Sequence, residues 1–342
     1  MRVAVTGGTG FVGSHTVEAL LAAGHDVRLL IRDPARVAPA FEPLGIDALD
    51  DLRVGDVTSA LDVESLLQGC DAVVHAASIY SLDVRDAAAI RQTNVAGTKL
   101  VIEAARRLDL DPIVHVSSVA ALIPADRPVD SDSPVATHAA GLYGQSKAES
   151  EALARRHQDD AAPVVTVMPG TVWGPHDPHF GESDRLASDF LRGRSRMLPG
   201  GATLGIVDVR DVAAVIAAIL EPGRGPRRFA LSPYHLAVVD LADALNRVTG
   251  RKIRFARLPD SVVRAAVAPA GLIQRLVPVR LPFNTESINA ALGWVPVDSR
   301  RAVDELGVEW RRLDETLTDT ITAMVAGGQL DAKFAGRLAA TH

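Results

Sequence analysis

The first thirteen residues constrain the fold of this chain more than any other segment. Met1 to Thr6 is an apolar run of strand length, and the glycine-rich segment Gly7 to Gly13 follows it directly, ahead of an amphipathic stretch. A strand, a tight glycine turn and a helix N-terminus bring free backbone N–H groups and a positive helix dipole against a phosphate. The pattern therefore predicts a cradle for the diphosphate of a dinucleotide. The residues expected around that diphosphate are Gly7, Thr9, Gly10, Phe11, Val12 and Gly13.

Length and composition indicate an ordinary globular enzyme-sized chain. The 342 residues are 47% hydrophobic and 23% charged, which is typical of one large α/β domain with or without a smaller appendage. A net charge of −6 without a basic stripe argues against a nucleic-acid partner. The lone cysteine, Cys70, cannot form an internal disulfide, so we expect a buried structural thiol and a cytoplasmic protein. No metal site is expected.

The sequence predicts no membrane span and no signal peptide. The first strand begins at residue 1, which leaves no room for a leader. The longest apolar candidate is the stretch Val262 to Val279, and two prolines, two arginines and a glutamine interrupt it. We interpret that stretch as core, with the wall of a lipid-like substrate site as the alternative.

The first half of the chain alternates short apolar strands with helical segments, which is typical of a doubly wound parallel sheet of Rossmann type. The expected strands are Arg2–Thr6, Asp26–Ile31, Leu52–Val54, Ala72–His75, Ile113–Ser117 and Val164–Val167. The expected helices are Phe11–Ala23, Ala60–Gln68, Asp86–Arg107 and Leu142–His157, with a return helix at Val209–Leu220 and a strand at Arg228–Leu231. We expect residues 1–168 and a return segment, about 205–232, to bind the cofactor. Residues 169–204 and 233–342 then form a smaller, mainly helical substrate region, with few strands from His235 onward.

The tip of the second strand favours NADP(H) as the cofactor. An acidic residue at this tip holds the ribose of NAD, whereas an arginine pairs with the 2′-phosphate of NADP. Here Ile31 stands at the tip, Arg32 follows it, and Arg36 is a second cation. We interpret Asp33 as a turn residue ahead of Pro34, and its carboxylate keeps NAD(H) open as the alternative. Further residues expected along the cofactor are Asp56 and Val57 after the third strand, and His75, Ala76, Ala77 and Ser78 at the end of the fourth. For His75 a purely structural role is an equal alternative.

Tyr143 and Lys147 stand four residues apart on a predicted helix, so they share a face. A lysine cation beside a tyrosine lowers the pKa of the phenol and makes it a general acid or base. Ser118, after the fifth strand, adds a hydroxyl that can donate to a carbonyl oxygen, and Ser117 is the alternative hydroxyl. Asn94 lies inside a helix, where asparagine is mildly unfavourable, so we expect it to position backbone or water rather than face solvent.

Taken together, these segments resemble the extended short-chain dehydrogenases/reductases, the NAD(P)-dependent epimerase/dehydratase family. The resemblance covers about residues 1 to 232. The matching segments are Thr6–Gly13, Gly55–Val57, His75–Ala77, Asn94–Thr98, Ser117–Ser118, Tyr143 with Lys147, Pro169–Pro175 and Val207–Val212. It implies a catalytic triad of Ser118, Tyr143 and Lys147, with Lys147 also on the nicotinamide ribose. It also implies that Pro169, Gly170 and Val172 pass along the nicotinamide. Asp208 and Asp211 are then structural. A homodimer through the helices at Asp86–Arg107 and Leu142–His157 is a further implication.

Within the family, the chain is most similar to the dihydroflavonol and cinnamoyl-CoA reductase branch. The segments that match this branch are Ile31 to Pro34 and Leu198 to Gly201. That branch implies NADPH-dependent reduction of a ketone or aldehyde of a small, fairly apolar substrate. The alternatives are an NAD-dependent nucleotide-sugar epimerase, a 3β-hydroxysteroid dehydrogenase-like enzyme, or a non-catalytic NADP-binding protein. Val119 and Ala120 follow Ser118 where sugar dehydratases carry an acid, and Met168 stands where the family often has arginine.

Overall fold

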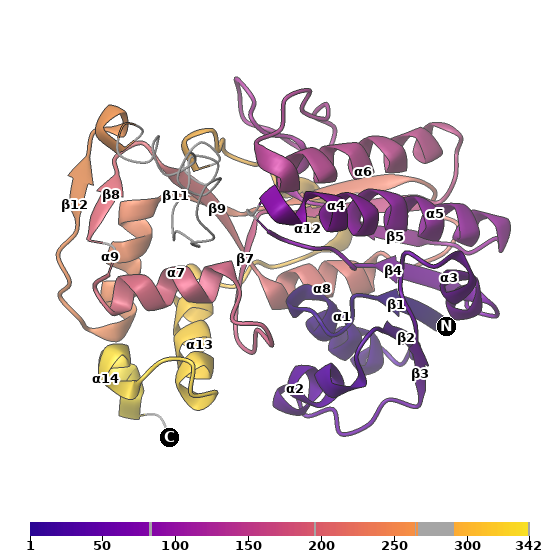
Figure 1. Ribbon diagram of the computed structural model, residues 1–342, viewed down its shortest axis with the longest axis horizontal. Helices are drawn as coiled ribbons and strands as arrows, with labels where there is room; N and C mark the ends of the chain where they lie inside the picture. Colours follow the sequence, from indigo (N-terminus) through magenta and orange to yellow (C-terminus); the bar gives the residue numbers. More distant parts are fainter. Residues whose placement is uncertain (82–83, 195, 264, 266–290, 341–342) are drawn as a thin grey trace.

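A parallel sheet forms the centre of the molecule (Figure 1). The computed structural model describes residues 1–81, 84–194, 196–263, 265 and 291–340. Within those residues, seven strands form one sheet in the order β10-β6-β5-β4-β1-β2-β3, with every neighbouring pair parallel. The strands are β1 (Arg2–Thr6), β2 (Asp26–Ile31), β3 (Asp51–Val54), β4 (Ala72–His75), β5 (Ile113–Val116), β6 (Val164–Pro169) and β10 (Arg227–Leu231). The predicted doubly wound Rossmann-type fold is confirmed.

Helices cover both faces of this sheet, as Figure 1 shows. One layer contains α1 (Phe11–Ala22), α2 (Val37–Phe41), α8 (Val209–Ala218) and α12 (Arg300–Leu306). The other contains α3 (Ala60–Leu67), α4 (Ala87–Ile90), α5 (Thr98–Arg107) and α6 (Gly141–Asp159). Alternate strand residues point to opposite faces, so Val5 on β1 packs into the core under α1 while its neighbour Ala4 packs under α3 and α5. The strand C-termini therefore meet at one edge, where a doubly wound sheet binds its ligand.

The predicted helix Asp86–Arg107 is divided into three segments. It comprises α4, a π-helical segment η4 (Arg91–Gly97) and α5, preceded by the short 3-10 turn η3 (Val84–Asp86). The remaining 3-10 turns are η1 (Pro34–Arg36), η2 (Glu42–Leu44), η5 (Val119–Ala121) and η6 (Gly336–Ala340). A π segment widens the helix by one residue and frees backbone groups for other partners.

The second half of the chain contains more strands than the sequence predicts. A three-stranded sheet has the order β11-β9-β7, and a two-stranded sheet pairs β12 with β8. Their bounds are β7 (Thr171–Trp173), β8 (Met197–Pro199), β9 (Thr203–Asp208), β11 (Tyr234–Ala237) and β12 (Ala256–Leu258). These strands are three to six residues long and stand among prolines and glycines. Most of these segments are too short to show a period of two, which is why the sequence does not predict them. From His235 onward the only strands that the described residues form are β11 and β12, which agrees with the expectation of few strands there.

The helices of this region pack around a hydrophobic core of their own. They are α7 (Glu182–Leu191), α9 (Val238–Thr249), α13 (Leu313–Ala326) and α14 (Ala332–Ala335). Trp173, Phe190 and Ile321 are fully buried in that core. The domain boundaries at 168, 205 and 232 stay a prediction. Nearly all of the apolar stretch Val262 to Val279 lies outside the described residues. No helix in the described part of the chain is long and apolar enough to cross a membrane. Cys70 is buried and free, as expected.

Candidate active site

The glycine turn after β1 leaves no space for side chains. Gly7 has a φ of +74°, and a Cβ there would lie 2.5 Å from the backbone nitrogen of Ala77. A Cβ on Gly13 would lie 2.0 Å from the carbonyl oxygen of Gly7, so α1 packs directly against the turn. Gly10 is the N-cap of α1 and offers no side-chain cap, and the first turn of α1 carries no acidic residue. Its N–H groups are therefore available to a phosphate, and these residues fit a dinucleotide diphosphate.

A cavity of about 530 Å³ opens at this turn, along the C-terminal ends of β1, β2 and β4. Nine residues predicted along the cofactor line it: Gly7, Thr9, Gly10, Arg32, Arg36, Val57, Ala76, Ala77 and Ser78. Seven others line it as well: Thr6, Leu30, Asp33, Gly55, Ile79, Thr93 and His179. Most of the second group are neighbours of predicted residues, and the rule that strand ends face the ligand would have found them. His179 comes from a distant loop, and no sequence pattern indicates it.

The tip of β2 presents two arginines to the cavity. The Asp33 carboxylate accepts a hydrogen bond from the backbone N–H of Ala35 at 3.0 Å and so begins η1, as the turn interpretation predicts. Arg36 Nε lies 3.8 Å from the same carboxylate, and Arg32 Nη1 lies 3.9 Å from Asp56 Oδ2. Both arginine side chains are more than half exposed, so neither is committed to a buried ion pair.

His75 has a structural setting. Its Nδ1 lies 2.7 Å from the Thr6 hydroxyl, and its Nε2 lies 3.0 Å from the Thr98 hydroxyl. Burial lowers its pKa to about 3, so the ring is neutral. Its ring stacks on that of His115, whose two nitrogens have no hydrogen-bond partner among the described residues. Both ring nitrogens of His75 are therefore occupied by threonines, which favours the structural alternative over cofactor contact through this side chain.

Asn94 clamps the segment after β4 to α6. Its Oδ1 accepts from the Ile79 N–H at 2.8 Å, and its Nδ2 donates to the Ile79 carbonyl at 3.0 Å and to Ser146 Oγ at 3.0 Å. It lies in the π segment η4 and is buried, so the solvent-facing alternative is wrong. The expectation that Asn94 positions backbone is confirmed. Because Ile79 lines the cavity, this clamp sets one wall of it.

Ser118 and Tyr143 meet at the end of β5. Ser118 Oγ donates to the carbonyl of Pro169 at 3.4 Å and accepts from the N–H of Ala120 at 3.1 Å. It also forms a hydrogen bond with the Tyr143 side chain. Ser117 Oγ is buried and has no partner among the residues described, so of the two serines only Ser118 reaches the phenol.

The Tyr143 ring lies in an aromatic and cationic setting. It packs edge-on against Tyr80 with the ring centroids 4.7 Å apart, and Lys147 Nζ lies 5.8 Å from its centroid. Burial raises the pKa of Tyr143 to about 12, although the hydrogen bond with Ser118 opposes this shift. Lys147 is not among the groups that shift this pKa, so the expectation that it lowers the pKa of Tyr143 is not met in the protein on its own, where burial dominates. At neutral pH the phenol therefore carries its proton.

Lys147 is buried on the inner face of α6. Its Nζ donates to the carbonyl of Val116 at 3.2 Å, at the end of β5. Burial lowers the pKa of Lys147 to about 8, while the carboxylate of Glu151, one turn further along α6, raises it. Glu151 is fully buried and accepts from Arg155 Nε at 2.8 Å. One helix therefore carries the phenol, the ammonium and the carboxylate that keeps the ammonium charged.

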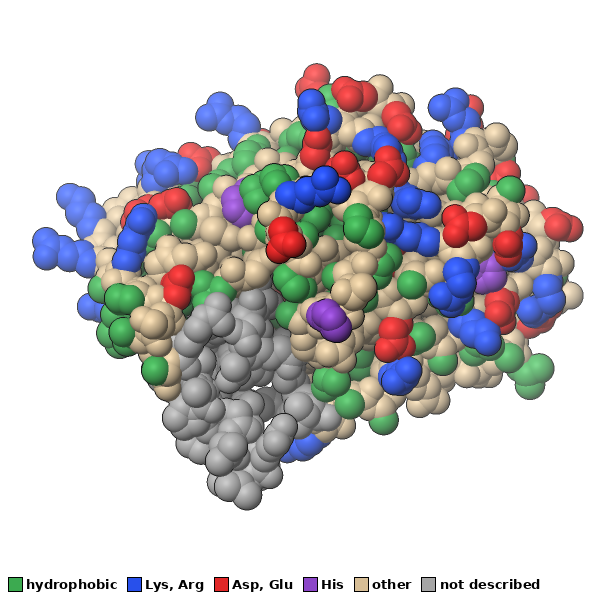
Figure 2. All heavy atoms as spheres, turned by 90° about the horizontal axis from the view of Figure 1, so that it is seen from above, with side chains coloured by type: hydrophobic (Ala, Val, Ile, Leu, Met, Phe, Trp, Pro, Cys, Tyr) green, Lys and Arg blue, Asp and Glu red, His purple; other side chains and the backbone are tan. Residues whose placement is uncertain are grey.

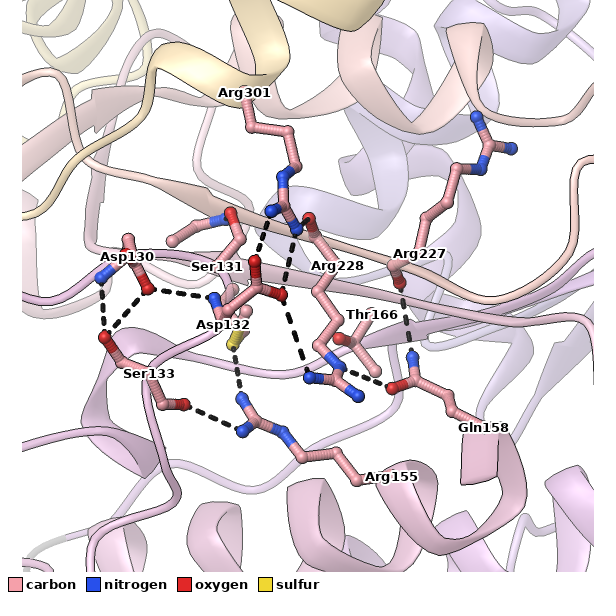
Figure 3. Close-up of polar contacts among 12 residues, drawn as sticks. Asp130, Ser131, Asp132, Ser133, Arg155, Gln158, Thr166, Arg227, Arg228 and Arg301 are labelled. Carbon is pink, nitrogen blue, oxygen red and sulfur yellow. Dashed lines mark hydrogen bonds and ion pairs between the residues drawn. The ribbon is translucent and has the colours of Figure 1, made fainter. Parts of the chain in front are cut away.

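An arginine network behind this helix holds the wall of the site in place (Figure 3). Arg155 Nη1 donates to the Ser133 carbonyl at 2.8 Å, and Arg155 Nη2 lies 3.9 Å from Met168 Sδ. Asp132 pairs with Arg301 of α12 and lies 3.8 Å from Arg228 of β10. The loop at 130–133 is thereby tied to α6, β6, β10 and α12. Arg155, from α6, supplies a guanidinium beside Met168, the position where the sequence departs from the family.

Several other predicted cofactor residues do not line the cavity. Phe11 begins α1, and its ring packs edge-on against His15 at 5.7 Å. The backbone N–H of Gly170 donates to the Leu231 carbonyl at 2.8 Å, and a Cβ there would lie 2.6 Å from Ser232 Oγ. Val172 on β7 packs against the core under α1. Val12, Asp56 and Pro169 also lie outside the lining residues.

With this geometry established, comparison with known proteins identifies the family. A model of the NAD dependent epimerase/dehydratase family matches residues 3–231. The chain belongs to that family. It is therefore an NAD(P)-dependent oxidoreductase of the short-chain dehydrogenase/reductase type, as the sequence predicts.

Two relatives match over nearly the whole chain. A protein named putative dihydroflavonol 4-reductase from Synechocystis sp. is 31% identical over 93% of this chain and 92% of its own length. Sterol demethylase protein B from Methylococcus capsulatus is 31% identical over 90% of this chain and 93% of its own length. A cinnamoyl-CoA reductase 1 from Oryza sativa subsp. japonica is 29% identical over 85% of this chain. The predicted likeness to reductases of this family is confirmed.

Solved structures share the same fold. The crystal structure of gox2253 superposes with a TM-score of 0.81, 27% identity and coverage of 97% of this chain and 99% of that one. A UDP-glucuronic acid 4-epimerase from Bacillus cereus, in complex with UDP-glucuronic acid and NAD, superposes with a TM-score of 0.76 at 20% identity and covers 95% of this chain. At that identity the likeness shows the fold alone. The family nevertheless establishes a nicotinamide dinucleotide as the class of cofactor.

Proposed function

We propose that this protein is an NADPH-dependent carbonyl reductase, with Ser118, Tyr143 and Lys147 as its catalytic residues. The observation that carries the proposal is the meeting of these three side chains at the C-terminal end of β5, beside the cavity at the glycine turn. Tyr143 holds its proton at neutral pH, so its phenol is a donor to an oxygen that gains negative charge.

Each of the three residues has its own task in a reduction. Ser118 and Tyr143 bind the carbonyl oxygen and polarise it, and Tyr143 delivers the proton from its phenol oxygen. When bound, the reduced nicotinamide supplies the hydride that reaches the carbonyl carbon. The Lys147 ammonium stabilises the phenolate that is left on Tyr143, and Glu151 stabilises the ammonium.

The cavity favours NADPH over NADH. Arg32 and Arg36 both line it at the tip of β2, and both have exposed guanidinium groups that can form paired hydrogen bonds with a 2′-phosphate. Asp33 uses one carboxylate oxygen to begin η1, which leaves it poorly placed to hold a ribose. The chain's residues therefore offer cations, rather than a free carboxylate, to the adenosine ribose.

The surroundings of Ser118 favour a small and fairly apolar substrate. The segment that follows Ser118 contributes Val119, Leu122 and Val129 to a buried apolar cluster, and the Tyr80 ring packs beside that of Tyr143. Among the relatives, the ketoreductase from Stigmatella aurantiaca is named for a farnesylated quinoline oxide, and it is 29% identical over 96% of this chain. An apolar wall desolvates the carbonyl and strengthens the hydrogen bonds from Ser118 and Tyr143.

Substitution of Tyr143 tests this function. Tyr143→Phe is expected to lower NADPH-dependent turnover of a panel of alkyl and aryl ketones and aldehydes by about a hundredfold or more, because the proton donor is lost. NADPH affinity, measured by fluorescence titration, is expected to change less than about twofold. Tyr80→Phe is the matched control, since it keeps the neighbouring ring, and it should retain turnover. Wild-type protein that reduces no member of the panel, or Tyr143→Phe with full activity, contradicts the proposal.

A further inference from the structure

One side chain from the second half of the chain enters the cavity at the glycine turn. The lining residues from Thr6 to Thr93 all belong to the first four strands and their connections, whereas His179 lies in the loop between β7 and α7. Its side chain is exposed on the cavity. In Figure 1 this loop descends from β7 between the two halves of the molecule, beside α1 and α8.

The loop is fixed in shape by Asp177, which is buried. One of its carboxylate oxygens accepts from the N–H of His179 at 2.9 Å, and the other accepts from the N–H of Gly181 at 2.9 Å. Both bonds hold the backbone on either side of Phe180, whose φ is +48°. A non-glycine residue in this conformation needs such support. The backbone position from which the His179 side chain projects is therefore fixed by the loop.

The loop is also attached to the cofactor helix. His15, one turn into α1 beyond Phe11, has its Nε2 2.9 Å from the carbonyl oxygen of Pro175. Burial lowers the pKa of His15 to about 4, so the ring is neutral and Nε2 carries the proton that the carbonyl accepts. This bond places the start of the loop over the N-terminal part of α1, the helix end that faces a dinucleotide diphosphate.

We propose that His179 binds the diphosphate of the dinucleotide from the side opposite the glycine turn, so that the substrate region clamps the cofactor. The inference rests on the proposed dinucleotide site. The glycine turn supplies only backbone donors, and the cationic side chains in the cavity, Arg32 and Arg36, lie at the tip of β2. The imidazole N–H of His179, on the side opposite the glycine turn, adds a side-chain donor to the phosphates.

The diphosphate is common to NADPH and NADH, and this gives the proposal a selective test. His179→Ala is expected to weaken the binding of NADPH, NADH and ADP-ribose by the same factor, about tenfold, which corresponds to one charge-assisted hydrogen bond. Arg32→Ala is expected to weaken NADPH alone. The measurement is a titration of each purified variant by calorimetry or by nucleotide fluorescence, with thermal unfolding to verify folding.

His176→Ala is the matched control, because His176 stands on the same exposed loop and does not line the cavity. It is expected to leave all three affinities unchanged, and His179→Gln, which retains an N–H donor, is expected to recover part of the loss. Unchanged affinities in His179→Ala, or a loss confined to NADPH, would overturn the clamp. Equal losses together with a wild-type preference for NADH would support the clamp and refute the NADPH assignment, so the two failures are distinguishable.

Discussion

At the scale of single residues, burial determines which ionisable groups carry charge in this protein. Tyr143 keeps its proton because its phenol has lost hydration, and His75 stays neutral for the same reason. Asp184 of α7, outside the active site, is a further group that burial keeps uncharged. Its side chain is 2% exposed, and burial, followed by repulsion from Asp177, raises its pKa to about 8. Asp177 is the residue that holds the loop of His179, so the proton on Asp184 lies next to a carboxylate of that loop as well as within α7.

The raised pKa of Asp184 makes stability depend on pH in a defined direction. Below about pH 4 the carboxyl is protonated in both the folded and the unfolded chain, and it has no effect. Between pH 4 and 8 the unfolded chain releases this proton and the folded chain does not. The free energy of unfolding therefore falls as pH rises, by up to about 1.4 kcal/mol per pH unit, and levels off above pH 8.

Asp184→Asn is expected to remove this dependence. The difference in Tm between the variant and the wild type should grow from pH 5 to pH 8 and then stay constant, as followed by thermal unfolding with circular dichroism. Asp189→Asn is the control on the same helix, because Asp189 is partly exposed and pairs with Arg194 at 3.5 Å. Its effect on Tm should be the same across the range from pH 5 to pH 8. A Tm difference for Asp184→Asn that does not change with pH would refute this account.

Sequence reasoning predicted the positions of single residues well where a strand end or a turn decides the position. Gly7, Arg32 and Ser118 follow strands whose ends must face the ligand, and the turn role of Asp33 follows from the proline behind it. Sequence could not identify His179 or Tyr80, because each reaches the site through a loop whose path depends on distant contacts such as that of His15 with Pro175. It also overestimated the effect of Lys147 on Tyr143, since the extent of burial is a property of the folded chain.

At the scale of elements, the π segment η4 connects the cavity wall to the catalytic helix. The Asn94 carbonyl accepts from the Ser150 hydroxyl of α6 and from the Thr98 hydroxyl, each at 2.6 Å, while the Asn94 side chain binds both backbone groups of Ile79. Single π turns inside α-helices occur often at functional sites. Sequence showed the helix and the unusual asparagine, but a π turn has no pattern of its own.

Asn94→Ala is expected to lower stability and to weaken the dinucleotide site together. The variant leaves the N–H and C=O of Ile79 unpaired, at a cost of about 1–3 kcal/mol in the free energy of unfolding. Because Ile79 lines the cavity, NADPH affinity should fall severalfold as well. Urea denaturation and NADPH titration measure the two effects.

Asn246 on α9 provides a matched control, because it binds both backbone groups of Ile253 in the same way, at 2.7 and 3.0 Å. Asn246→Ala is expected to cost a similar free energy of unfolding and to leave NADPH affinity unchanged. Equal effects of the two substitutions on affinity would show that the Asn94 clamp acts only through stability.

At the scale of the whole molecule, the two halves share one small sheet. Neighbouring residues of β7 face different cores: Val172 packs under α1, whereas Trp173 is buried in the core of the second half. On β9, Val207 packs into the core under α1, and its neighbour Ile206 packs into the core of the second half. A sheet with one face in each core transmits the loss of either core to the other. This joining of the halves was hidden from the sequence, because it depends on the short strands that periodicity missed.

We therefore expect the chain to unfold as one cooperative unit, and its three tryptophans can report this. Trp173 lies in the core of the second half, Trp310 packs against the core under α1, and Trp294 packs against the cluster behind Ser118. Three variants, each retaining one tryptophan with phenylalanine at the other two positions, should show urea midpoints by fluorescence that coincide with the midpoint by circular dichroism of the same variant. A Trp173 signal that changes at a different denaturant concentration from the Trp310 signal would mean that the shared sheet does not couple the two cores, and that the second half of the chain unfolds on its own.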